Sequence, residues 1–181
     1  MDYGKGCIVL ANTKKSFLST IIRFFSRSRF SHTFVTMPSI VGVPMCAEDS
    51  SAGVDILRFD TGYLQNPSES IEIWQLSISD QAKDAGLLAV VNELEQGYAY
   101  ASLPWFGWRW FNGLFGKDIS NQNNWSLKND VCSGLVRDRY MVGAGIGSLL
   151  AKFGKNSVWP EDISQVMNAR PDLFVKVFSN F

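Results

Sequence analysis

Two side chains in the sequence have the types that thiol catalysis requires, Cys132 and the single histidine, His32. A thiol attacks a carbonyl as its thiolate, which is favoured at the start of a helix and beside an imidazolium. Asp130 is a residue type that caps helices, so we expect Cys132 in the first turn of a helix. A packed, hydrogen-bonded histidine and a small buried thiol are the alternative interpretations.

A histidine base also needs a third polar group that orients its ring and stabilises its cation. Glu48 ends the strand predicted to follow the one that carries His32, and its neighbour Asp49 is the competing candidate. Alternate residues of a strand point to opposite faces of the sheet, so only one of these acids can lie beside His32. We expect it to be Glu48, with a solvated carboxylate at a hairpin end as the alternative.

The elements that position these residues follow from hydrophobic periodicity and turn residues. Strands are predicted at 6–11, 30–37, 41–48, 54–57, 71–76 and 173–178, and helices at 17–25, 80–96 with Asp80 as N-cap, 131–142, briefly at 148–153, and from Pro160. Because strands and helices are segregated rather than regularly alternating, the predicted class is α+β. We expect a single domain over residues 1–181, with a small antiparallel sheet packed against the helix of Cys132.

An aromatic stretch at 104–115, inside an irregular segment from Tyr98 to Trp125, has neither strand nor helix periodicity. Ordinary packing of large aromatic side chains is one interpretation. The sharper one is an apolar wall or lid beside the active site, with Arg109 at its surface.

The composition excludes several classes of function. Lysine plus arginine equals aspartate plus glutamate at 17 each, so no basic field exists to hold a nucleic acid. The three cysteines form no CxxC pair, which argues against a disulfide framework and a zinc site; no metal or cofactor is expected. No secretory signal or run of about 18 apolar residues is present, so the expected location is cytoplasmic, or delivered without a signal peptide, as in a virion.

The ordered motifs resemble a known family. They are Gly6-Cys7-Ile8, Ser31-His32, Ala47-Glu48, Gly97-Tyr98-Ala99-Tyr100 and Cys132-Ser133-Gly134, followed by Trp159-Pro160-Glu161-Asp162. In this order they resemble the YiiX-like group of permuted NlpC-type papain-like cysteine hydrolases, over nearly the whole chain. The family has its histidine before its cysteine, which inverts the order in papain.

The resemblance implies Cys132 as nucleophile, His32 as general base and Glu48 as the orienting member. It also implies substrate or oxyanion contacts by Tyr100 and Ser133. The chain departs from the family pattern at Cys7, Val131 and Ala101, which bears on substrate and oxyanion details.

The implied activity is that of a cysteine peptidase or amidase, which cleaves a peptide or amide bond, such as those of peptidoglycan, through an acyl-enzyme. The expected origin is phage or bacterial. The alternatives are an acyltransferase or thioesterase that acts on lipids, like the lecithin retinol acyltransferase relatives, and a non-catalytic virion or effector module.

Overall fold

The computed structural model describes residues 3–14, 17–50, 53–94, 108, 111–112, 115–117, 132–153 and 158–181. Six antiparallel strands form one sheet in the order β4-β3-β2-β1-β5-β6. The strands are β1 (Ile8–Thr13), β2 (His32–Ile40), β3 (Val43–Ser50), β4 (Gly53–Arg58), β5 (Glu69–Leu76) and β6 (Phe174–Ser179). The predicted mixture of helices with an antiparallel sheet is therefore confirmed.

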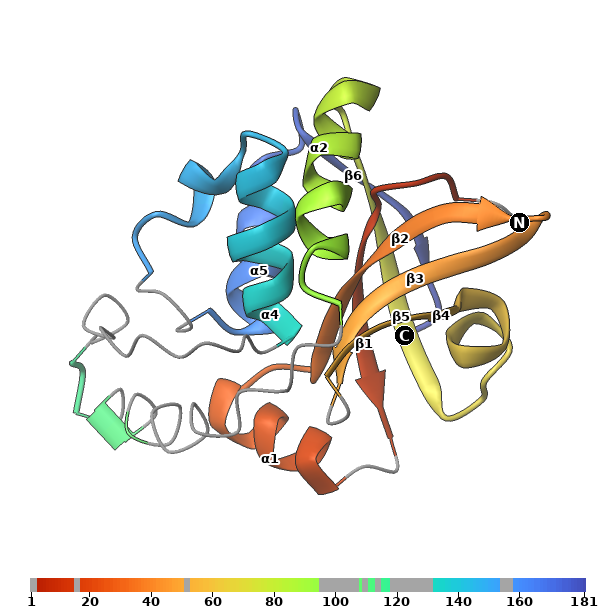
Figure 1. Ribbon diagram of the computed structural model, residues 1–181. Helices are drawn as coiled ribbons and strands as arrows, with labels where there is room; N and C mark the ends of the chain where they lie inside the picture. The colour runs from red at the N-terminus through yellow and green to blue at the C-terminus, as the bar shows by residue number, and fades with distance from the viewer. Residues whose placement is uncertain are drawn as a thin grey trace.

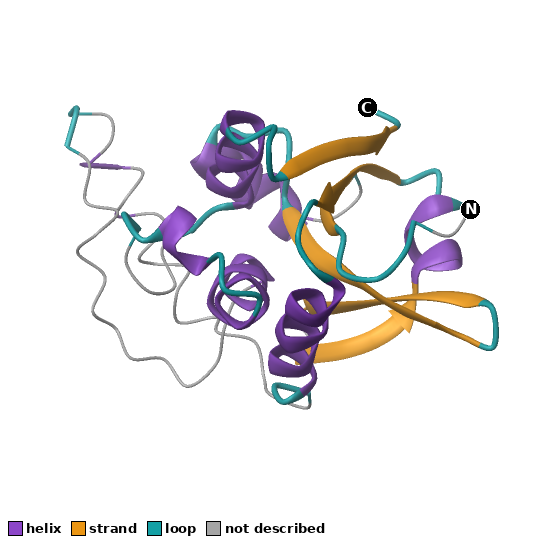
Figure 2. Cartoon of the chain, turned by 90° about the horizontal axis from the view of Figure 1, so that it is seen from above, coloured by secondary structure: helices purple, strands orange, loops and turns teal. Residues whose placement is uncertain are grey.

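The helices gather mainly on one side of the sheet, as Figures 1 and 2 show in two directions. They are α1 (Phe17–Ser26), α2 (Asp80–Val91), α4 (Cys132–Gly134), which continues as the π-helix η3 (Leu135–Met141), the 3-10 turn η4 (Gly147–Leu150) and α5 (Pro160–Ala169). A further π-helical turn, η1 (Asp60–Leu64), follows β4. None of the described helices has both the length and the apolar composition needed to cross a bilayer.

Strand alternation gives the sheet two apolar faces. Ile8, Leu10 and Val35 pack against the helices, where η3 and α5 supply Leu135, Tyr140, Ile163 and Met167. Val9, Phe34 and Cys46 point to the other face and pack with Phe59 and Tyr63 around η1. Because both faces of β1 are covered, this strand begins as a continuous apolar run rather than an alternating one.

Both ends of α2 differ from the sequence prediction. Ser79, not Asp80, is the N-cap of α2, because its hydroxyl accepts the Ala82 N–H at 3.2 Å. This helix ends at Val91, before the predicted limit of residue 96, and residues 95–97 lie outside the described part. The proline-led helix α5 is confirmed, and Asp162 accepts the N–H of its N-cap, Trp159, at 2.8 Å.

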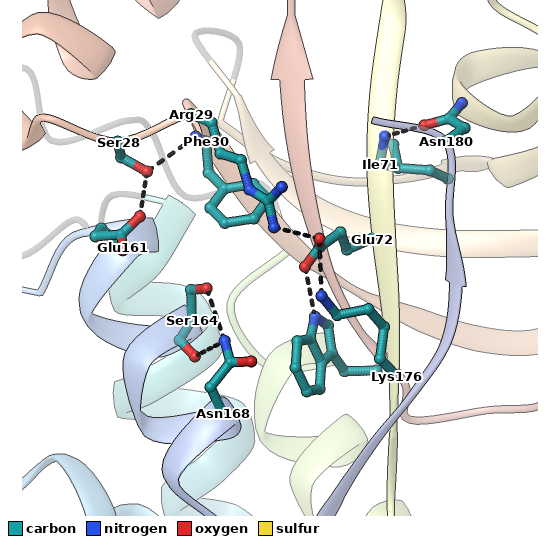
Figure 3. Close-up of polar contacts among 11 residues, drawn as sticks. Ser28, Arg29, Phe30, Ile71, Glu72, Glu161, Ser164, Asn168, Lys176 and Asn180 are labelled. Carbon is teal, nitrogen blue, oxygen red and sulfur yellow. Dashed lines mark hydrogen bonds and ion pairs between the residues drawn. The ribbon is translucent and has the colours of Figure 1, made fainter.

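A buried carboxylate, Glu72, fixes the loop that leads into His32. Its side chain is 1% exposed and accepts from Arg29 at 2.5 Å and from Lys176 at 3.0 Å. Figure 3 shows both cationic side chains converging on this carboxylate. The indole of Trp74 donates to its other oxygen at 3.2 Å. The same loop is held to α5 by the Ser28 hydroxyl, which donates to Glu161 at 2.7 Å.

Glu72→Gln is expected to lower the free energy of unfolding by about 1–3 kcal/mol, because two cations lose their buried anion. The loss stays moderate because Arg29 and Lys176 are 53% and 34% exposed and remain hydrated. Urea denaturation measures it. Asp80→Asn is the matched control, since its side chain is 80% exposed and surface changes cost about 0.5 kcal/mol or less. Equal stabilities of the two variants would show that the Glu72 cluster does not hold the fold.

Candidate active site

His32 opens β2 at the end of the sheet where α1 joins it. Its Cα pairs with Ala11 of β1, and the preceding Ser31 N–H donates to the Ala11 carbonyl at 2.9 Å. Alternation with Phe34 turns the ring toward the face that carries η1. Pairing with β1 therefore fixes the backbone that carries the ring.

Glu48 is the carboxylate that contacts this ring. Its Oε2 lies 2.9 Å from Nε2 of His32, and both side chains are largely buried. Asp49 is fully buried on the other side of the strand, where it also lines the pocket described below. The structure thus brings Glu48 and His32 together as strand alternation predicted.

Cys132 is the first described residue of α4, which contacts β2 and β3. It is buried, and its thiol is a hydrogen-bond and charge partner of His32. Since Nε2 of His32 is bonded to Glu48, the thiol has the other ring nitrogen, Nδ1, available to it. Cys132, His32 and Glu48 therefore form one chain of polar contacts.

The pKa values of His32 and Glu48 are shifted in opposite directions. Burial lowers the pKa of His32, but the charge and hydrogen bond of Cys132, followed by those of Glu48, outweigh it and raise the pKa well above its ordinary value. Burial raises the pKa of Glu48, and the contacts from His32 and Tyr63 outweigh it, so the net change is downward. Around neutral pH the arrangement favours an imidazolium beside a carboxylate.

Tyr63 of η1 is a member of the site that the sequence did not indicate. Its hydroxyl donates to Oε2 of Glu48, the same oxygen that faces His32. The ring packs 4.2 Å from that of Phe34 and is buried. Tyr63 thereby gives the Glu48 carboxylate a second hydrogen-bond partner besides the histidine. The only available signal was an aromatic residue in the Gly62-Tyr63 turn between two strands, which is typical of many loops.

Tyr63→Phe is expected to move the acid limb of Cys132 alkylation toward neutral pH, because the lost hydrogen bond helps to keep the pKa of Glu48 low. Unfolding should become easier by about 1 kcal/mol at pH 7. The alkylation rate, measured from pH 3 to 8, separates this effect from simple destabilisation, which lowers the rate without moving the limb. An unmoved acid limb would contradict the role of Tyr63.

A pocket of about 360 Å³ connects these residues. It is lined by Thr13, Ser19, Ile22, Ser31, His32, Glu48, Asp49, Ser50, Leu57, Gly62, Tyr63, Glu69 and Cys132. The lining comes from α1, η1, α4 and the ends of several strands. A ligand in this pocket therefore reaches both the thiol and the imidazole.

The other two cysteines lie away from the histidine. Burial and the Glu48 charge raise the pKa of Cys46, which disfavours its thiolate. Cys7 is buried, and its thiol donates to the Tyr3 carbonyl at 3.1 Å. Among the three cysteines, only Cys132 contacts an imidazole and a pocket.

The remaining predicted site residues fall into two groups. The hydroxyl of Ser133 is buried and donates to the Val158 carbonyl at 2.5 Å, so it is engaged with the segment before α5. Tyr100 and Asp130 lie outside the described residues, as does most of the 104–115 stretch. Of its aromatics, Trp108, Phe111 and Phe115 are described; they are exposed and in contact with one another.

No group of three or more His, Cys, Asp or Glu side chains that could hold a metal ion occurs among the described residues. The histidine and Glu48 are already bonded to each other at 2.9 Å. The donor set at the site suits proton transfer between a thiol, an imidazole and a carboxylate.

Comparison with known proteins gives a fold relationship. No protein-family model matches the sequence, and no curated protein matches it. The structure is similar to the crystal structure of the metalloprotein yiiX from Escherichia coli O157:H7, with a TM-score of 0.67 and 13% sequence identity. The match covers 100% of this chain and 99% of that one. At this identity the likeness shows the fold alone, and the YiiX-like fold that the sequence predicts is confirmed.

Proposed function

We propose that the protein is a cysteine-dependent acyl hydrolase of the permuted papain-like type, with peptide or amide bonds as substrates. The observation that carries the proposal is the 2.9 Å contact between Nε2 of His32 and Oε2 of Glu48. The Cys132 thiol interacts with the same imidazole ring, and all three residues line one pocket. A nucleophile, a base beside it and a carboxylate that orients the base are the groups that catalytic triads use for covalent acyl transfer.

The reaction has two halves. The Cys132 thiol gives its proton to His32, and the thiolate attacks the carbonyl carbon of the substrate. His32 then protonates the leaving amine as the carbon–nitrogen bond breaks, which leaves a thioester on Cys132. Water attacks the thioester with His32 as base, and the acid product leaves with the thiol restored. Glu48 stabilises the imidazolium in both halves.

The oxyanion of each tetrahedral intermediate needs donors aimed at the position it will occupy. The backbone N–H of Cys132 is one candidate, because the residue begins a helical run. Tyr100 is the second candidate by family resemblance. Removing one such donor typically lowers the turnover number by about a hundredfold or more.

The yiiX neighbour is described as a metalloprotein. The described residues of this chain offer no cluster of three ligating side chains, so they do not fit a metal site of that size. The proposed mechanism therefore uses only the thiol, the imidazole and the carboxylate.

A lipid acyl group is the second candidate substrate, and α1 provides the observation in its favour. Ser19 and Ile22 of this helix line the pocket. The apolar side chain of Ile22 in the pocket wall suits an acyl chain. We favour the peptide or amide bond because the chain has no net charge excess to hold it at an anionic membrane.

The two substrates separate in one parallel assay. Wild type and Cys132→Ala are incubated with peptidoglycan fragments, a bacterial cell-wall peptide source, and with labelled phospholipid vesicles. Cleaved muropeptides with wild type alone support the peptidase. Transfer from vesicles with intact muropeptides supports the lipid enzyme. If both substrates survive and no adduct forms on Cys132, the fold serves here as a non-catalytic virion or effector module.

A further inference from the structure

The first strand after η1, β5, carries two buried carboxylates that differ sharply in their partners. Glu72 has two cations and an indole within hydrogen-bond distance, as Figure 3 shows. Glu69 is only 7% exposed, yet its one side-chain partner in the described part of the chain is the Thr13 hydroxyl, which donates at 3.0 Å. A buried carboxylate whose one hydrogen-bond partner is a neutral hydroxyl is costly, and such groups in a pocket are candidates for binding.

The sheet register sets Glu69 beside the catalytic pair. Ala11 is paired with His32 on one side and with Ile71 on the other, and Thr13 is paired with Glu69. Residues that are paired across strands, and alternate residues along one strand, share a face of the sheet. Glu69 therefore lies on the same face as His32, two positions before Ile71 on β5. Glu69, His32 and Cys132 accordingly line the same pocket.

The charges around Glu69 leave room for a cationic ligand. Three carboxylates, Glu48, Asp49 and Glu69, line the pocket. Its described lining includes no lysine or arginine, and the His32 imidazolium is already bonded to Glu48. Burial and the charge of Glu48 raise the pKa of Glu69, while Thr13, His32 and the exposed Lys14 oppose them; the net change is upward. A bound cation would offset the cost that burial imposes on this carboxylate.

We propose that Glu69 and Thr13 form a subsite for a primary ammonium group of the substrate, beside the carbonyl that Cys132 attacks. An ammonium group has three donors, which suit one carboxylate oxygen and the lone pairs of the Thr13 hydroxyl. The inference rests on the proposed function and adds the substrate class: amino-bearing peptides or amides rather than neutral acyl groups.

Matched alkylating probes test the subsite without a known substrate. The probes are N-(2-aminoethyl)-, N-(4-aminobutyl)- and N-(6-aminohexyl)iodoacetamide, each paired with the N-alkyl iodoacetamide of the same chain length. The thiolate of Cys132 displaces iodide from either probe, so only the ammonium group differs within a pair. Alkylation of Cys132 is followed by mass spectrometry near pH 6.5, and the readout is the rate ratio within each pair.

We expect a ratio of about ten or more for at least one chain length, because a charge-assisted hydrogen bond is lost with the neutral probe. Glu69→Gln should bring that ratio close to one, while Asp80→Asn, which removes an exposed charge outside the pocket, should keep it. The ratio cancels any general loss of reactivity. Glu69→Asp, which retains the charge, should keep a ratio above that of Glu69→Gln.

Two results overturn the subsite. One is a ratio near one at every chain length in wild type, and the other is an unchanged ratio in Glu69→Gln. Both leave the proposed function standing if Cys132 is still alkylated much faster than Cys7 and Cys46. Failure of the proposed function has a different signature, in which no probe prefers Cys132 over the other two cysteines.

Discussion

Replacing His32 with alanine is expected to slow the acylation of Cys132 by p-nitrophenyl acetate at pH 6 by about a hundredfold or more. An unassisted thiol is only about 0.3% ionised at this pH. In the wild type, Cys132 lies beside an imidazole whose pKa is raised by the thiol and by Glu48. Release of p-nitrophenol under single-turnover conditions measures the rate.

Two controls show whether the lower acylation rate of His32→Ala comes from the missing base. Cys132→Ala reports the background reaction of the other thiols, and urea denaturation of His32→Ala reports whether the fold survives. Added imidazole should restore part of the rate, because it can occupy the space of the missing ring. A loss of less than about threefold in a folded His32→Ala protein would mean that the histidine does not act as the base.

Glu48→Gln is expected to have the second largest effect, a loss of about ten- to a hundredfold in the same assay. The amide keeps the shape of the side chain but removes the charge that helps to raise the pKa of His32. The base limb of the pH profile should therefore move to lower pH. Asp49→Asn changes the neighbouring carboxylate on the other face of β3 and should cost less.

The stability of Glu48→Gln should depend on pH with a definite sign. The raised pKa of His32 stabilises the fold at pH values below the pKa of histidine in the unfolded chain, about 6.5, and this contribution is lost as the pH rises through the folded-state pKa. The lowered pKa of Glu48 stabilises the fold at pH values above the pKa of glutamate in the unfolded chain, about 4.3, and this contribution is lost as the pH falls through the folded-state pKa. The deficit of Glu48→Gln relative to wild type should be widest between pH ~4.3 and ~6.5 and should narrow outside it. A deficit independent of pH would mean that the two groups are not coupled.

Local sequence patterns predicted the strands and the face of the sheet on which Glu48 lies, beside His32. The alternation of Ala47, Glu48 and Asp49 needed only the period of a strand, and His32 followed from the β-branched and aromatic run after it. The N-cap of α2 was misplaced by one residue, because Ser79 and Asp80 are both good caps and only the backbone geometry separates them.

The supporting residues could not be predicted, because their roles depend on contacts between distant segments. Tyr63 reaches Glu48 only when η1 folds back under the sheet, and no periodicity marks a single π-helical turn. Glu69 joins the pocket through the pairing of β1 with β5, across 56 positions of sequence. Glu72 likewise gains its cations from Arg29 and from Lys176 of the last strand.

Selective alkylation of the three cysteines in the folded wild-type protein tests the central claim most directly. Iodoacetamide is added at pH 6, the reaction is stopped at intervals, and peptide mapping gives a separate rate for Cys7, Cys46 and Cys132. We predict that Cys132 reacts at least about a hundredfold faster than the other two, since it alone has an imidazole partner at a pocket. Equal rates at all three positions, or a faster reaction at Cys46, would contradict the assignment of Cys132 as the nucleophile.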